Sequence, residues 1–206
     1  MKPEQIYDIL DKKFPNASSE LNFSSNFELL VCVILSAQCT DKRVNEVTKT
    51  LFKKYNTPNQ FASLKQEELE KLIYSCGFYH NKAKNIIACS KQLVEKYNGE
   101  VPNDLNALQT LSGVGRKTAN VVYSVAFGGD AIAVDTHVFR TSNRLGLSNS
   151  NNVLDCEKDL MKALPKNLWS KMHYLLVLFG RYNCKSQNPK CDTCEFKHIC
   201  KYYKTK

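Results

Sequence analysis

Apolar residues recur along most of the chain at the three-to-four-residue period of amphipathic helices. One stripe covers residues 83–97, and Asn98-Gly99 ends it. Its inward positions are Ala83, Ile86, Ile87, Ser90, Leu93, Val94 and Tyr97. Similar patterns predict further helices at about residues 3–14, 40–54, 104–110, 117–127, 136–144, 152–164 and 168–179. The one strand-like stretch, Ala131–Val134, is too short to found a sheet, so we predict an all-α protein.

Local signals place several helix ends. Ser25–Glu28 reads as a capping box that opens a buried helix over Leu29–Leu35. Ser63–Gln66 reads as a second box, whose helix stops at Gly77 as a left-handed cap. Gly180 is expected to close the helix of residues 168–179.

Composition narrows the class of protein. The 206 residues carry a formal net charge of +9, and 43% are hydrophobic, which disfavours disorder. The longest apolar run, Leu29–Leu35, is far shorter than the roughly 20 residues of a membrane span. With no signal-like N-terminal stretch, we expect a cytoplasmic protein. The basic balance fits either a nucleic-acid partner or an ordinary lysine-rich surface.

The nine cysteines fall into two groups. Cys32, Cys39, Cys76, Cys89 and Cys156 are scattered among apolar neighbours and are expected to be reduced and buried. Cys184, Cys191, Cys194 and Cys200 lie within 17 residues, at the spacing C-x6-C-x2-C-x5-C. Structural zinc usually takes two close pairs, whereas only one close pair is present here. The spacing therefore favours a 4Fe–4S cluster.

A second group of residues joins two predicted helices. Gly113-Val114-Gly115 permits a tight turn whose backbone amides can seat a phosphate. With leucines before it and valines after it, this segment reads as a helix–hairpin–helix grip on a nucleic-acid backbone. Lys117 is either a further phosphate contact, like Arg116, or a nucleophile. The positive end of the helix and partial desolvation would both favour its neutral amine.

Asp135 follows the apolar stretch that ends at Val134 and is expected to cap the next helix, with the Thr136 hydroxyl alongside. Near a basic groove, its carboxylate could instead stabilise a cationic sugar or accept a proton from an attacking amine. The residue alone leaves both roles open.

Five segments in this order resemble the endonuclease III family, the bifunctional DNA glycosylase/AP lyases of the helix–hairpin–helix superfamily. They are L-S-A-Q-C-T-D (35–41), L-S-G-V-G-R-K-T-A (111–119), V-D-T-H (134–137), F-G-R-Y-N-C (179–184) and the four-cysteine loop. The resemblance implies two helical lobes with DNA bound across the cleft between them. Residues 22–130 would form a six-helix barrel with the hairpin, and residues 1–21 plus 131–206 would carry the cluster.

The resemblance also implies the chemistry. Lys117 would attack C1′ of an oxidised pyrimidine nucleotide and form a Schiff base, and β-elimination would then cut the strand. Asp135 would assist deprotonation of Lys117 and stabilise the oxocarbenium-like sugar, and Cys184, Cys191, Cys194 and Cys200 would hold the 4Fe–4S cluster. The hairpin would often hold a monovalent cation. The implied DNA contacts are Gln38, Phe78, Gly113, Val114, Gly115, Arg116, Thr136, Lys185 and Lys190.

Two positions depart from the family pattern, since Phe78 replaces a common leucine and Ser112 replaces a proline. Two other functions stay open: a monofunctional mismatch or adenine-type glycosylase that uses Asp135, and a non-catalytic helix–hairpin–helix DNA-binding module. Lys117 favours the bifunctional enzyme. The expected partner is duplex DNA containing oxidised pyrimidines or abasic sites, bound by a monomer with no membrane association.

Overall fold

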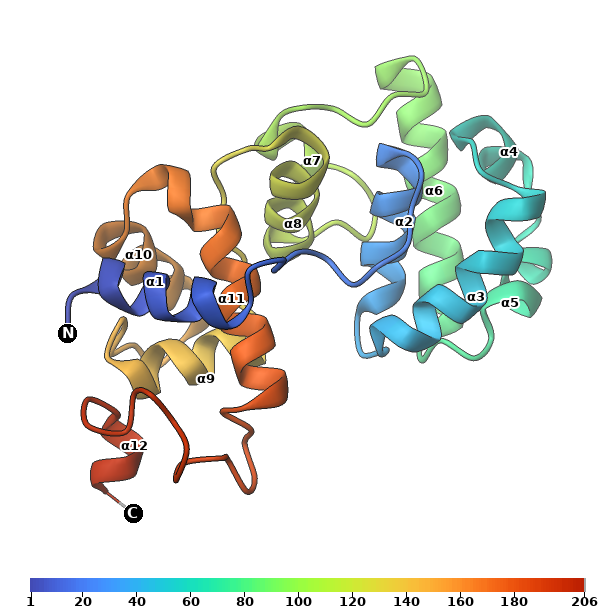
Figure 1. Cartoon of the computed structure of the whole chain (residues 1–206). Coiled ribbons are helices and arrows are strands. Elements are labelled where there is room, and N and C mark those ends of the chain that lie inside the picture. Colours follow the sequence, from blue (N-terminus) through green and yellow to red (C-terminus); the bar gives the residue numbers. More distant parts are fainter. Residues whose placement is uncertain (206) are drawn as a thin grey trace. The chain divides into compact units, whose positions relative to one another are not determined.

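A computed structural model describes residues 1–205, which contain helices and no strand (Figure 1). The all-α prediction is therefore confirmed. Contacts divide the chain into a central unit, Glu20–Phe127, and a terminal unit that joins Met1–Ser19 to Gly128–Lys206. These bounds differ by two to three residues from those that the resemblance implied. Among the described residues no helix is long and apolar enough to cross a membrane.

The central unit packs around one almost wholly apolar helix, α2, in which every residue from Phe27 to Leu35 is buried. A helix that is apolar on all sides must be covered on all sides, and α3, α6 and α8 pack against it. The helices of this unit are α2 (Asn26–Ser36), α3 (Asp41–Lys54), α4 (Pro58–Ser63), α5 (Gln66–Ile73), α6 (Tyr79–Tyr97), α7 (Leu105–Gln109) and α8 (Arg116–Phe127).

The first capping box is present in a modified form. The Ser25 hydroxyl accepts a hydrogen bond from the Glu28 amide at 3.1 Å, as predicted. The Glu28 carboxylate, however, accepts from the amide of Ser24 at 2.6 Å rather than from that of Ser25. The backbone amides of Ser24 and Glu28, near the start of α2, thus both have hydrogen-bond acceptors within the protein.

The prediction of a second capping box at Ser63–Gln66 is wrong. Ser63 is the last residue of α4, and its hydroxyl donates to the carbonyls of that helix. Helix α4 is capped by Thr57, which precedes Pro58. Helix α5, which the predicted box should open, follows Lys65, whose side chain makes no capping hydrogen bond. Helix α5 ends at Ile73, and the left-handed residue that follows is Phe78 (φ 59°), so Gly77 is not the predicted cap.

The terminal unit has its own core, built from both ends of the chain. Helix α1 packs against α11, and an ion pair between Asp11 and Lys171 ties the two together. Lys13 pairs with Glu195 at 2.6 Å. The helices of this unit are α1 (Pro3–Lys13), α9 (Thr136–Leu145), α10 (Val153–Ala163), η1 (Lys166–Leu168), α11 (Trp169–Tyr182) and α12 (Lys201–Lys204).

Gly180 does not close its helix, because α11 continues to Tyr182. A Cβ at Gly180 would lie 2.9 Å from the Cβ of His137 on α9. This glycine therefore allows the close approach of α9 and α11, which pack against each other.

The strand-like segment 131–134 is extended and buried but pairs with no strand. His173 of α11, itself buried, holds its backbone through a contact of 2.7 Å between Nδ1 and the Ala133 carbonyl. This contact fixes the backbone of the segment, and Asp135, the residue that follows it, therefore has a defined position at the start of α9.

Candidate active site

The hairpin lies between α7 and α8, and the loop Thr110–Gly115 joins them. Gly113 has a φ of +77°, and a Cβ there would lie 2.9 Å from the Cβ of Asn85 on α6. Backbone conformation and space thus both require glycine at this position.

Gln92 of α6 forms two hydrogen bonds to the backbone of the hairpin loop. Its Oε1 accepts a hydrogen bond from the Ser112 amide at 2.7 Å, and its Nε2 donates to the Thr110 carbonyl at 3.3 Å. No local pattern predicts this contact, because the partners lie about 20 residues apart in the chain. The glutamine therefore fixes the loop on both sides of Leu111, at Thr110 and at Ser112.

Gly115 differs from Gly113. It is exposed, its φ is not left-handed, and a Cβ there would meet no atom within 4 Å. Its carbonyl accepts from the Ala119 amide at 2.9 Å, which begins α8. Neither the backbone conformation nor the packing requires glycine at this position, and the space beside it at the start of α8 is open.

The two glycines give a testable contrast. We expect Gly113→Ala to lower the free energy of unfolding by about 1–3 kcal/mol, because a left-handed backbone and a clash coincide. Gly115→Ala should change it by less than about 0.5 kcal/mol but weaken DNA binding. Denaturant melts and fluorescence-anisotropy titrations with duplex DNA measure the two effects. Equal loss of stability in both variants would contradict a ligand-facing role for Gly115.

Lys117 lies in the first turn of α8, next to Arg116, and both side chains are exposed. Lys117 makes no ion pair or hydrogen bond within residues 1–205. The predicted partial desolvation is therefore wrong for the unbound chain, since its own residues do not cover this amine.

Asp135 caps α9, as predicted. Its Oδ1 accepts hydrogen bonds from the amides of His137 and Val138, both at 2.8 Å. The residue is half-buried, and the neighbouring Thr136 is exposed. Because both cap bonds use Oδ1, Oδ2 is available for a second partner. The structural and the chemical roles of Asp135 are therefore compatible.

Arg140, one turn further along α9, was not found from the sequence. Its guanidinium donates to the carbonyls of Gly180 and Cys184, both at 2.9 Å, and lies 3.2 Å from Nδ1 of His137. Burial lowers the pKa of His137, Asp135 opposes this effect, and Arg140 adds to it. A guanidinium only donates, so a hydrogen bond at this contact requires Nδ1 as the acceptor, while a hydrogen bond from the ring to the Gly180 backbone raises the pKa of His137.

The four clustered cysteines follow α11 on one loop. Cys200 is buried, and the other three are partly exposed. In residues 1–205 no three candidate ligand side chains converge as they would around a bound metal ion. Burial raises the pKa of both Cys184 and Cys194, and the charge of Cys200 adds to the effect in each. Cys184, Cys194 and Cys200 thus influence one another electrostatically, and four cysteine thiols on one loop are the donor set of an iron–sulfur cluster.

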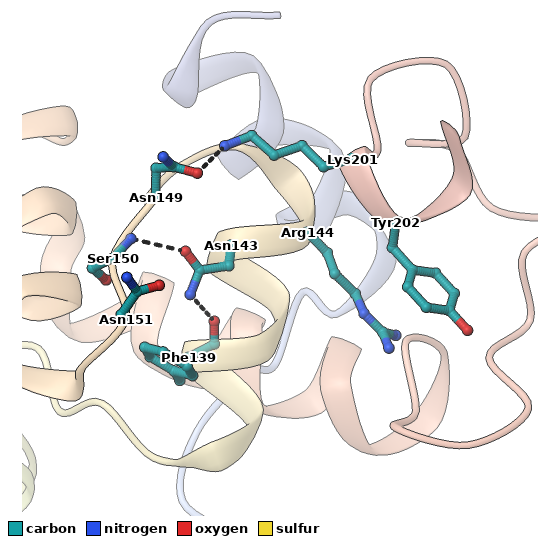
Figure 2. A pocket seen from close by; sticks show the side chains of 8 residues that line it. All are labelled: Phe139, Asn143, Arg144, Asn149, Ser150, Asn151, Lys201 and Tyr202. Atoms are coloured by element: carbon teal, nitrogen blue, oxygen red, sulfur yellow. Dashed lines mark hydrogen bonds between the residues drawn. The ribbon is translucent and has the colours of Figure 1, made fainter. Parts of the chain in front are cut away.

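Arg144 connects this loop to a pocket of about 430 Å³ in the terminal unit (Figure 2). Its Nη1 donates to Cys184 Sγ at 3.4 Å and to the Lys185 carbonyl at 2.9 Å. The guanidinium carbon lies 3.9 Å from the centre of the Tyr202 ring, and Lys201 reaches Asn149 at 2.9 Å. No acidic side chain lines the pocket. The surface beside the cysteine loop is therefore cationic.

The remaining predicted contacts are on exposed loops. Phe78 is 62% exposed, and Gln38 and Phe78 both have left-handed backbones, with φ of 52° and 59°. Lys185 and Lys190 are exposed between the first two clustered cysteines. The Lys190 amide donates to the Asn183 carbonyl at 3.0 Å and so closes this loop.

Comparison with known proteins decides the family. The family model described as HhH-GPD superfamily base excision DNA repair protein matches residues 31–166. The chain belongs to the HhH-GPD superfamily. It is 54% identical to endonuclease III of Bacillus subtilis (strain 168) over 202 residues, 96% of this chain and 92% of that one. It is 45% identical to endonuclease III of Escherichia coli (strain K12) over 96% of this chain and 94% of that one.

Solved structures agree with this assignment. A trapped endonuclease III–DNA covalent intermediate is 52% identical, with a TM-score of 0.94, over 100% of this chain and 98% of that one. A thermostable thymine-DNA glycosylase, only 21% identical, shares the fold with a TM-score of 0.89 over 98% and 97% of the two chains. The resemblance to the endonuclease III family is thus confirmed.

Within this HhH-GPD fold the predicted site residues are divided between the two units. The central unit carries Gln38, Phe78, the hairpin with Gly113, Val114, Gly115 and Arg116, and Lys117. The terminal unit carries Asp135, Thr136, Lys185, Lys190 and the four cysteines. Of the hairpin residues, Val114 is buried, with 5% of its surface exposed, so only its backbone can face a ligand.

Proposed function

We propose that this chain removes oxidised pyrimidines from duplex DNA and cleaves the resulting abasic site through a Schiff base on Lys117. It is a base excision repair DNA glycosylase with AP lyase activity, and its partner is duplex DNA with a damaged base. The observation that carries the proposed mechanism is the exposed, unpaired amine of Lys117 at the start of α8, directly after the hairpin.

Lys117 supplies the nucleophile. Its neutral Nζ attacks C1′, and the base departs with the bonding electrons of the glycosidic bond. Loss of the second amine proton and opening of the sugar ring give a Schiff base. Removal of a C2′ proton then expels the 3′ phosphate, and water releases the enzyme. Bound DNA would exclude water from Lys117.

Asp135 serves this reaction through Oδ2. Oδ1 is held by two amides of α9, so the carboxylate has one fixed orientation. Its negative charge would stabilise the oxocarbenium-like sugar and would accept a proton from the attacking amine. The same cap that starts α9 therefore preorganises the catalytic carboxylate.

DNA is gripped through its phosphates. The amides of Gly113 and Gly115, together with Arg116, Thr136, Lys185 and Lys190, would bind the backbone independently of sequence, while the Val114 amide already donates to the Leu111 carbonyl at 3.1 Å. Gln38 and Phe78 would fill the space that the everted nucleotide leaves, Phe78 by stacking. A monovalent cation at the hairpin stays a prediction.

Cys184, Cys191, Cys194 and Cys200 would hold a 4Fe–4S cluster. When bound, the cluster supplies a covalent cross-link for a loop that is too short to form a core of its own. We propose that the chain acts in the cytoplasm, since the relatives named above are bacterial. We also propose that it acts as a monomer.

Product analysis tests this function. With a duplex that contains one thymine glycol, we expect free thymine glycol and a strand cut 3′ to the lesion, and the matched undamaged duplex should remain intact. Base release without a cut would support a monofunctional glycosylase centred on Asp135. Binding without either product would leave a DNA-binding module and contradict the proposal.

A further inference from the structure

The two loops that carry Gln38 and Phe78 each contain a cysteine next to or near that residue. Cys39 directly follows Gln38 and is partly exposed, and Cys76 directly precedes Gly77-Phe78 and is fully buried. Although 37 positions separate them in the chain, the two side chains interact through a hydrogen bond and through their charges. Both belong to the central unit.

The loops themselves are in contact. A Cβ at Gly77 would lie 3.5 Å from the carbonyl oxygen of Gln38. Each loop also contains a non-glycine residue in a left-handed conformation, Gln38 in one and Phe78 in the other. Such backbones persist only where the surrounding structure holds them, so the two loops support each other.

A buried cation completes the cluster. Only 5% of Lys82 is exposed, and its ammonium donates to the Leu35 carbonyl at 2.7 Å. Burial lowers the pKa of Lys82, and the charges of Cys39 and Cys76 oppose that effect, so the lysine lies next to both thiols. Burial, together with Cys39, raises the pKa of Cys76 to about 12, and Lys82 and Arg43 act against this.

We propose that Cys39 and Cys76 form a modification site that a peroxide converts into a disulfide between the Gln38 and Phe78 loops. The partly exposed Cys39 thiolate attacks hydrogen peroxide, and hydroxide leaves to give a sulfenic acid. The Cys76 thiol then displaces the hydroxyl group as water, and the S–S bond forms. Two thiols and one peroxide thus yield one disulfide and two waters.

The other cysteines do not offer this arrangement. Burial raises the pKa of Cys32 and of Cys89 to about 12. Neither side chain is exposed to an oxidant, and Cys32 donates instead to the Asn22 carbonyl at 3.6 Å. Among the described residues outside the four-cysteine loop, the pair at residues 39 and 76 combines a partly exposed thiol, a second thiol beside it and a neighbouring ammonium.

The effect on activity rests on the proposed function of Gln38 and Phe78. If these side chains enter the duplex when a damaged nucleotide leaves it, a disulfide directly behind them prevents the loops from adjusting independently. We expect oxidation to slow excision of thymine glycol about fivefold or more, because loop rearrangement would then limit turnover. A thiol reductant should restore the rate.

The modification is measured without reference to activity. The purified protein, with its cluster intact by visible absorption, is treated with limiting hydrogen peroxide, alkylated and digested. We expect one peptide pair, joined through Cys39 and Cys76, that is lighter than the two reduced peptides by two hydrogen atoms. Cys39→Ala should form no such link. Cys89→Ala is the matched control, because it removes a buried thiol outside the pair, and it should form the link normally.

Three results would overturn the proposal: no linked peptide, oxidation of Cys39 to a sulfinic acid with Cys76 unchanged, or a link between Cys32 and Cys76. If the disulfide forms but excision keeps its rate, the site stands and its effect on the loops is refuted. Because the peptide map does not depend on catalysis, failure of the glycosylase proposal would leave the result readable.

Discussion

We expect the Lys117→Gln protein to form no covalent adduct with damaged DNA under borohydride and to cleave an abasic strand roughly 10³-fold more slowly or worse. Glutamine keeps nearly the length and the polarity of lysine but has no nucleophilic amine, so no Schiff base can form. The fold should be unaffected, because the Lys117 side chain is exposed and makes no ion pair or hydrogen bond within residues 1–205. Borohydride trapping on a thymine glycol duplex and on an abasic duplex measures the loss.

Arg116→Gln provides the matched control. It removes one positive charge from the adjacent position on the same helix turn, so it reproduces the electrostatic change of Lys117→Gln without removing the amine. We expect weaker binding that depends less on salt, with the adduct still formed at saturating protein. An adduct of normal yield in Lys117→Gln would place the nucleophile elsewhere.

Asp135 allows its two roles to be separated by two substitutions. Asparagine retains Oδ1 as the acceptor for the amides of His137 and Val138 but loses the charge. Asp135→Asn should therefore lower excision by about 10²-fold or more, with a change in the free energy of unfolding below about 0.5 kcal/mol. Asp135→Ala should lose the same activity and also about 1 kcal/mol of stability, because α9 loses its cap.

Single-turnover excision rates and denaturant melts on the two variants give the comparison. Full activity in Asp135→Asn would show that the residue is only a cap. Equal destabilisation by asparagine and alanine would show that the charge, and not the acceptor geometry, stabilises the start of α9.

Hydrophobic periodicity predicted most of the helices because each helix covers a core and must present an apolar face to it. Caps were predictable where the partner lies within three residues, as at Ser25 and Asp135. The three local errors arose because helix ends were assigned from short sequence patterns alone. Ser63 and Gly77 were assigned as helix caps in this way. Gly180 was assigned as the end of a helix, although it allows α9 to pack closely against α11.

Long-range partners account for what the sequence could not reveal. Gln92 reaches the hairpin from α6, Lys82 reaches the carbonyl end of α2, and Arg140 reaches the cysteine loop. Each is an ordinary polar residue on a helix face, with no motif around it. The expectation that Lys117 is partly desolvated failed for a different reason, since the covering surface would be DNA and is not part of the chain.

The discontinuous terminal unit has a consequence for the order of biosynthesis. Helix α1 is translated first, but its partner α11 begins only at Trp169, after the whole central unit. The central unit can therefore acquire its core while α1 is still without a partner. Contacts of such high sequence separation form slowly. A nascent chain would consequently complete the hairpin, one part of the proposed DNA-binding surface, before Asp135, the proposed catalytic carboxylate, is in its folded setting.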